Sequence, residues 1–314
     1  MSGFRNLITR SRCLGVIAAI VCSVCFAASK PPAFASQQVF PSTAAAAKAL
    51  IDAAQKDDLK ALESILGSDA KEVISSGDPV ADNNARDTLV AKYNEMHRMA
   101  YDDRGRVVLY IGADNWPLPI PIVKERDGWV FDTESGKEEL LYRRIGQNEL
   151  YTIDVLRDLA DAQLEYSSEG RHGDVKQFAQ KILSDSGKHD GLYWPVADGE
   201  PESPIGPLIA DATHEGYKRG TATPVPFHGY YYRVLTRQGK NAPGGAMDYI
   251  DHGRMIKGFA FLAYPAVYRA SGVMTFMINQ DGVVVQKDLG PETPKLAKEI
   301  SEFNPDKTWD QDLD

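Results

Sequence analysis

Cysteine is scarce in this sequence, and its placement excludes disulfides from most of the chain. All three cysteines lie within residues 1–35. In that segment, arginines precede an apolar run at residues 13–28, and small residues follow at Ala33 and Ala35, which is the pattern of a secretory signal peptide cleaved after Ala35. The apolar run is shorter than the roughly 20 residues that a helix needs to cross a bilayer. We therefore predict an exported protein, periplasmic or secreted, whose mature chain has no cysteine, no disulfide and no stable membrane anchor.

Clusters of positive charge are also lacking. The formal net charge is −9, and cleavage after Ala35 would make it more negative, because residues 1–35 contain basic residues and no acidic ones. No run of basic residues is longer than a pair such as Arg143 and Arg144. A surface of this charge repels nucleic acid and anionic lipid. The sequence therefore predicts no nucleic-acid partner, and the expected partner is an envelope protein or a glycan.

Catalytic and nucleotide-binding signatures are missing as well. The six histidines show no H-x-x-x-H or H-E-x-x-H spacing that would place two metal ligands on one helix face. The chain contains no G-x-S-x-G elbow, no phosphate-binding loop and no G-x-G-x-x-G after a strand. The sequence thus predicts no metal and no cofactor, and it favours a protein that is not an enzyme.

The residues that follow the signal segment have helical periodicity. Apolar spacing predicts helices over residues 43–55, 58–66 and 82–100, with Ser42, Asp57 and Asp82 as N-caps.

Short strand-like runs come next, at residues 106–112 and 128–132. The alternating prolines of residues 116–123 restrict that segment to an edge strand or a polyproline-like ribbon. Helices followed by a bent hairpin sheet predict a small α+β domain at residues 36–142. Its pattern is cone-like, of the kind found in nuclear-transport-factor-like domains.

The second half begins with a long amphipathic helix, predicted at residues 147–166. The next segment, residues 168–227, is expected to be a long loop with short helical stretches near residues 175–183 and 208–213. Strands are then predicted at residues 230–236, 258–264, 273–279 and 283–288.

These strands predict an antiparallel meander that the long helix covers. We expect them to form a second domain at residues 143–290. A tail at residues 291–314 adds one short helix and an acidic end. The whole chain is therefore expected to have an α+β fold.

Six motifs in order carry a resemblance to a bacterial family. They are residues 128–133 (GWVFDT), 143–149 (RRIGQNE), 191–195 (GLYWP), 203–207 (SPIGP), 228–230 (HGY) and 287–291 (KDLGP). With these motifs the chain resembles the exported family called domain of unknown function 2950. The resemblance spans nearly the whole mature chain and implies export, but no activity.

The second half also resembles the globular head of type IV pilins and pseudopilins. The residues concerned are 162–166 (AQLEY), 229–232 (GYYY), 263–265 (AYP) and 271–276 (SGVMTF). This resemblance implies one helix packed on a four-stranded antiparallel sheet. No prepilin cleavage site adjoins the helix, so the resemblance implies the head architecture and not a polymerising stalk.

Polar and aromatic residues gather in the long loop and at the start of the following sheet. The ligand-binding candidates are Tyr193, Trp194, Tyr231 and Arg233, because aromatic faces beside an arginine suit a sugar ring or an extended peptide. The alternative interpretation is that the aromatic residues fill the core under the loop, because alternation along the strand places Tyr230 and Tyr232 on one face and Tyr231 and Arg233 on the other.

Two functional hypotheses follow. The leading one is a non-catalytic binding or assembly module of the envelope. The other is a hydrolase or lyase that acts on an envelope polymer, because paired carboxylates and histidines can act as acid and base. Its candidate catalytic residues are His189, Asp190, Glu202 and His228.

Overall fold

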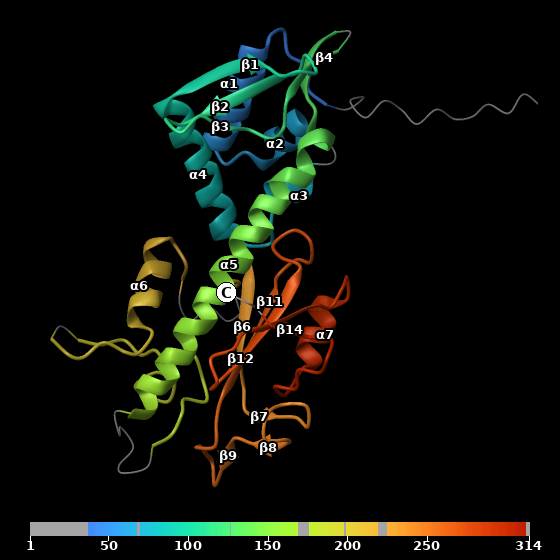
Figure 1. Ribbon diagram of the computed structural model, residues 1–314. Helices are drawn as coiled ribbons and strands as arrows, with labels where there is room; N and C mark the ends of the chain where they lie inside the picture. Colours follow the sequence, from blue (N-terminus) through green and yellow to red (C-terminus); the bar gives the residue numbers. More distant parts are fainter. Residues whose placement is uncertain are drawn as a thin grey trace, which may run out of the picture. The chain divides into compact units, whose positions relative to one another are not determined.

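The computed structural model describes residues 37–67, 70–125, 127–168, 176–197, 199–218 and 225–311. Helices and antiparallel sheets both contribute to the fold, so the α+β class expected from the sequence is confirmed (Figure 1). The predicted signal segment, residues 1–35, lies outside the described residues.

The first described elements are helices α1 (Thr43–Gln55), α2 (Leu59–Leu66), α3 (Lys71–Ile74) and α4 (Pro79–Glu95). Helix α1 has its predicted bounds, and Ser42 caps it by accepting a hydrogen bond from the N–H of Ala45. The predicted cap of α2 is wrong by one residue. Asp58 caps this helix by accepting from the N–H of Ala61, whereas Asp57 precedes it with a positive φ of 51°.

Helix α4 differs more from its prediction. Its N-cap is Asp78, which directly precedes a proline that suits the first helical position because its φ is fixed and its missing N–H needs no partner there. Asp82, the predicted cap, lies in the first turn, where its carboxylate accepts from the N–H of Ser76. The residues expected to complete this helix instead form strand β1 (His97–Tyr101).

The first sheet follows. Strands β1, β2 (Val107–Ile111), β4 (Ile122–Glu125) and β5 (Gly128–Phe131) lie in this order, and β3 (Trp116–Pro117) also pairs with β2. Every pairing is antiparallel. The strands predicted at residues 106–112 and 128–132 are confirmed. The proline-rich segment between them supplies β3 and the start of β4, and the residues between these two short strands belong to neither strand.

One helix joins the two halves of the described chain. Helix α5 runs without a break over Thr133–Ser168, so the predicted start at residue 147 is wrong. Gly136 is needed in its first turns, because a Cβ at this position would lie 2.4 Å from the carbonyl oxygen of Pro119.

The second sheet is the expected meander. Strands β6 (Tyr230–Leu235), β11 (Ala260–Pro265), β12 (Met274–Asn279), β13 (Val285–Asp288) and β14 (Asp310–Gln311) lie side by side in that order. All their pairings are antiparallel. The four predicted strands are confirmed, and β14 adds an edge strand from the tail. Helix α5 packs on β11 and β12, and α7 (Thr293–Glu299) packs on β11 (Figure 1).

Shorter elements complete the second half. Strand β7 (Arg237–Gln238) pairs with β8 (Met247–Asp248), and β9 (Ile250–Asp251) pairs with β10 (Arg254–Met255). The long loop contains α6 (Gly206–His214), as predicted. The other helix expected in this loop is not formed by the described residues: Phe178 instead forms a β-bridge with Met255, and Leu183 forms one with Tyr193.

The buried apolar side chains of the described residues form two clusters. The first includes Leu109 of the first sheet, and Leu140 of α5 packs against its edge. The second includes Leu156 of α5 and the inner side chains of the second sheet. Helix α5 therefore takes part in both cores. Separate folding of residues 36–142 and 143–290 stays a prediction.

Candidate functional site

The loop aromatics lie in the core and not on an open surface. Trp194 is only 3% exposed. The ring of His189 stacks on it with centroids 4.4 Å apart, and the ring of Tyr166 meets it edge-on at 6.4 Å. Tyr193 is half-buried against the second core. Trp194 therefore packs as a core residue, in contrast to the expectation that it anchors a ligand.

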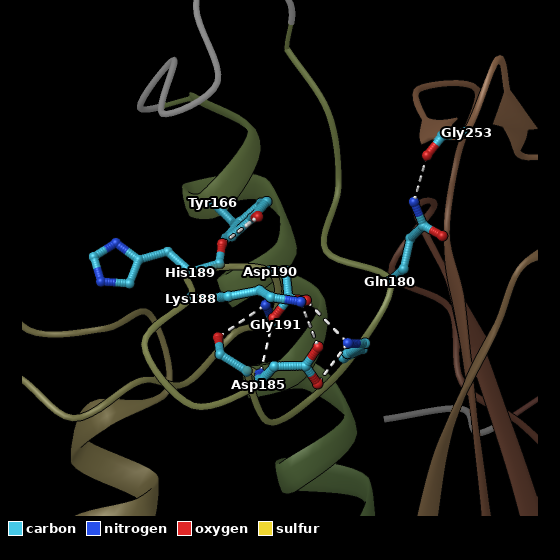
Figure 2. A network of polar contacts seen from close by, with 10 residues as sticks. Tyr166, Gln180, Asp185, Lys188, His189, Asp190, Gly191 and Gly253 are labelled. Atoms are coloured by element: carbon cyan, nitrogen blue, oxygen red, sulfur yellow. Dashed lines mark hydrogen bonds and ion pairs between the residues drawn. The ribbon is translucent and has the colours of Figure 1, made fainter.

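The carboxylate beside these aromatics has a structural role. In the network of Figure 2, Asp190 accepts hydrogen bonds from the Nζ of Lys181 and the backbone N–H of Asp185, each at 2.9 Å. The hydrogen bond from Lys181 lowers the pKa of Asp190. The side chain of His189 points away from this network, and its carbonyl oxygen accepts from the hydroxyl of Tyr166 at 2.7 Å. His189 and Asp190 therefore do not form an acid–base pair.

Arg233 binds the end of a helix and is not available on an open binding surface. Its guanidinium donates to the carbonyl oxygens of Ala297, at 2.9 Å, and Ile300. These carbonyls lie at the C-terminal end of α7, where they lack partners within the helix and carry partial negative charge. Tyr232 points to the opposite face, where its hydroxyl donates to the Oγ1 of Thr152 on α5 at 3.2 Å. The predicted alternation along β6 is confirmed, and both faces of this strand are covered.

Two further candidates lie apart from the others. Glu202 is exposed in the loop before α6. Tyr231 is half-buried, with its ring 5.5 Å from that of Tyr264. Neither lines the cavities described below, so the structure does not bring these candidates together with the rest.

His228 lies in a partly buried polar cluster. Its Nε2 is 2.8 Å from the Oε2 of Glu215, and both atoms are sealed from solvent although they are not aligned as a hydrogen bond. Its ring packs on that of Tyr151, with centroids 3.8 Å apart. The backbone is left-handed here, with a φ of 47°, and the N–H of His228 donates to the hydroxyl of Tyr217 at 3.1 Å.

Asp78 connects this cluster to α4. It is fully buried, and its Oδ1 accepts from the N–H groups of Val80 and Ala81, both at 3.1 Å. Its Oδ2 accepts from the hydroxyl of Tyr217 at 2.8 Å and from the N–H of Gly229 at 2.9 Å. One carboxylate thus satisfies donors from α4 and from the segment before β6, as a buried charge requires.

Burial sets the protonation states of the cluster. It lowers the pKa of His228, although the carboxylate of Glu215 acts in the opposite direction. Burial raises the pKa of Tyr151 to about 12 and raises that of Tyr217 further. At neutral pH the histidine is therefore neutral and both hydroxyls keep their protons, which suits a fixed hydrogen-bond network.

A cavity of about 330 Å³ lies next to this cluster, between α5, α6 and β6. Its wall includes Leu159 of α5, Ile209 of α6 and the ring of Tyr217. Neither His228 nor Glu215 lines it. Because a general base must reach the proton that it removes, the His–Glu pair is poorly placed to act on a molecule in this cavity.

A second cavity, of about 310 Å³, lies between α1, α2, α4 and the first sheet, and we call it the N-terminal cavity. Its mouth lies along α4, where the lining residues Ala85 and Thr88 are exposed. The charged lining residues are Asp82, Arg86, Lys92 and Arg144. The apolar lining residues are Leu50, Ala54, Leu62, Leu66, Val73, Ile74, Leu89, Ile111, Trp116, Leu118, Ile120 and Leu140.

Among the residues that the structure describes, no helix has the length and apolar content needed to cross a bilayer. Within the same residues, no three His, Cys, Asp or Glu side chains are grouped as metal ligands.

The fold and its cavities define an α+β protein with apolar, ligand-sized spaces. The family model described as "Protein of unknown function (DUF2950)" matches residues 37–311, so the chain belongs to this family. The resemblance carried by the six motifs is therefore confirmed. No curated protein and no solved structure matches the chain. The resemblance of the second half to pilin heads stays a prediction.

Sequence reasoning missed both the N-terminal cavity and the role of Asp78. For Asp78 a signal was present, because an aspartate directly before a proline is a typical N-cap followed by the first helical residue. For the cavity there was none, because its lining residues are ordinary core residues in sequence.

Proposed function

We propose that this protein is an exported, non-catalytic binding module that takes an apolar small molecule into the N-terminal cavity. The size and apolar wall of this cavity carry the proposal. Its volume of about 310 Å³ lies at the lower end of the roughly 300–1,000 Å³ typical of ligand pockets. An apolar cavity of roughly 150 Å³ in another protein is already large enough to bind benzene.

The packing of α4 supports the same proposal. Asp82 is the one buried residue of this helix. Leu89 lines the cavity from α4 and is only half-buried. A bound apolar molecule would cover Leu89 and remove further apolar surface from water, which stabilises the complex by about 25 cal/mol per Å².

The surroundings of the acid–base candidates favour a binding module over a hydrolase or lyase. Asp190 is bound to Lys181, and His189 packs on a buried tryptophan. His228 pairs with Glu215 outside both cavities. The proposed periplasmic or secreted location rests on the signal pattern of residues 1–35.

Fluorescence titration with N-phenyl-1-naphthylamine, an uncharged apolar dye, tests this function. We expect the protein to enhance the dye's emission saturably. Thr88→Trp would close the mouth of the N-terminal cavity and should weaken binding about tenfold or more, a loss of at least about 1.4 kcal/mol. Thr88→Val keeps the mouth open and is the matched control.

The variant Ile209→Trp places the same side chain in the other cavity and should leave dye binding within about twofold of the original. Circular dichroism of each variant checks that its fold is kept. Loss of binding in Ile209→Trp but not in Thr88→Trp would contradict the assignment to the N-terminal cavity. A complete absence of saturable emission would contradict the proposed function.

A further inference from the structure

The charged side chains of the N-terminal cavity are mostly positive. Arg86, Lys92 and Arg144 line it, together with one acidic residue, Asp82. The chain as a whole has a net charge of −9. Basic side chains therefore outnumber acidic ones in the lining of this cavity, in contrast to the chain as a whole.

Three of these charges already have partners in the protein. The carboxylate of Asp82 accepts from a backbone N–H before α4 at 3.0 Å. The Nε of Arg86 lies 2.7 Å from the Oδ1 of Asp57, and the Nζ of Lys92 lies 2.8 Å from the Oδ2 of Asp114.

Arg144 is different. Its guanidinium donates to the backbone carbonyls of Glu72 at 2.8 Å, Ala270 at 3.4 Å and Val73, and no carboxylate of the described residues lies within ion-pair distance of it. These bonds use three of its five N–H groups. Burial lowers the pKa of Arg144, while the charge of Asp82 opposes this effect. An arginine keeps its charge even so, and a partly buried cation without an anionic partner favours an incoming anion.

We propose that the ligand of the N-terminal cavity is an amphiphile with an apolar body and a single anionic group, a carboxylate or a phosphate, that binds Arg144. This inference rests on the proposed function, because it adds a head group to the apolar ligand which that function requires. The planar guanidinium binds carboxylates and phosphates through parallel N–H bonds. An uncharged head group would gain less, and a cationic one would be repelled by Arg144.

Competition against the bound dye tests the proposal on the whole protein. The competitors are decanoate, decyl phosphate, decan-1-ol and decyltrimethylammonium, which share one alkyl chain and differ in the head group. We expect both anions to bind about tenfold or more tighter than the alcohol, because a hydrogen bond to a charged group is stronger than one between neutral groups. The ammonium compound should bind more weakly than the alcohol.

The variants Arg144→Met and Arg144→Lys test whether Arg144 causes the preference for anionic head groups. In Arg144→Met, the anions should bind no better than the alcohol, whereas Arg144→Lys should keep part of the preference. If Arg144→Met does not fold, the competitor series on the unchanged protein still decides the question. Equal binding of decanoate and decan-1-ol would overturn the anionic head group and leave the apolar function intact. No saturable dye binding would instead contradict the proposed function itself.

Discussion

Removing the carboxylate of Asp78 is expected to weaken both halves of the protein together. This side chain caps α4 and also accepts from Tyr217 and Gly229 (2.8 and 2.9 Å). Loss of an N-cap costs about 0.5–2 kcal/mol. Each buried donor left without an acceptor costs about 1–3 kcal/mol. Asp78→Ala should therefore lower the free energy of unfolding by about 2.5–8 kcal/mol, a large share of the roughly 5–15 kcal/mol of a typical protein.

The matched variant Asp78→Asn separates the two roles. Its side-chain oxygen can still cap α4, and the hydroxyl of Tyr217 can turn to accept from the new amide group. The N–H of Gly229 can only donate, so one buried donor loses its acceptor. Asp78→Asn should therefore cost about 1–3 kcal/mol, clearly less than Asp78→Ala.

Urea unfolding, followed by circular dichroism, measures these costs. Combining Asp78→Ala with Tyr217→Phe should cost less than the sum of the two single changes, with a coupling of about 0.5–3 kcal/mol. A cost below about 1 kcal/mol for Asp78→Ala, or strict additivity with Tyr217→Phe, would refute the role assigned to this carboxylate.

Four further outcomes are expected. Trp194→Ala should lower the free energy of unfolding, measured in urea, by about 3–5 kcal/mol, because it removes a buried aromatic side chain. A loss below about 1 kcal/mol would contradict the placement of Trp194 in the core. Stability should fall as the pH is lowered from 7.5 through 6.5 and towards the depressed folded pKa of His228, because the unfolded histidine takes up a proton that the folded one resists; His228→Gln should flatten this slope, and an unchanged slope would contradict the assignment. Gly146→Ala should stabilise the protein by about 0.5–1 kcal/mol, because the glycine lies inside α5 with nothing within 4 Å of a new Cβ; a loss of stability would count against a continuous helix here. Finally, intact-mass measurement of the protein recovered from cells should show Ser36 as the first residue without attached lipid, and retention of residues 1–35 would contradict export by a cleaved signal.

The sequence predicted helices and strands best where the periodicity was uninterrupted. Helix α1 and the four predicted strands of the second sheet appear at their expected places, within a residue or two at each end. The start of α4 was wrong because Asp78 and Asp82 are both suitable caps by local pattern. The choice is made by Tyr217 and Gly229, which lie 139 and 151 positions further along the chain.

The long helix shows the same limit. Its first turns contain Gly136, which is unfavourable inside an isolated helix. The close approach of the backbone at Pro119 makes a glycine necessary there. A local pattern records the unfavourable glycine but not the packing that requires it.

The candidate site could be predicted only in part. Alternation along β6 correctly separated Tyr232 from Arg233, because strand geometry alone fixes which face each side chain takes. The sequence pattern of the loop could not distinguish a tryptophan that stacks on a ligand from one that is buried in the core. The place of Trp194 therefore followed only from the structure. The N-terminal cavity arises from space that side chains leave unfilled, and no residue type marks such a space in a sequence.

The unbroken course of α5 has a consequence for partial unfolding. At 36 residues the helix is about 54 Å long, and its two ends are held by different cores. If the first core melts, the C-terminal turns of the helix stay docked on the second sheet, and if the second core melts, the N-terminal turns stay docked on the first. Amide hydrogen exchange along this one helix should therefore report two opening free energies, with the change between them in its middle, where Tyr142 and Leu150 are more than 60% exposed.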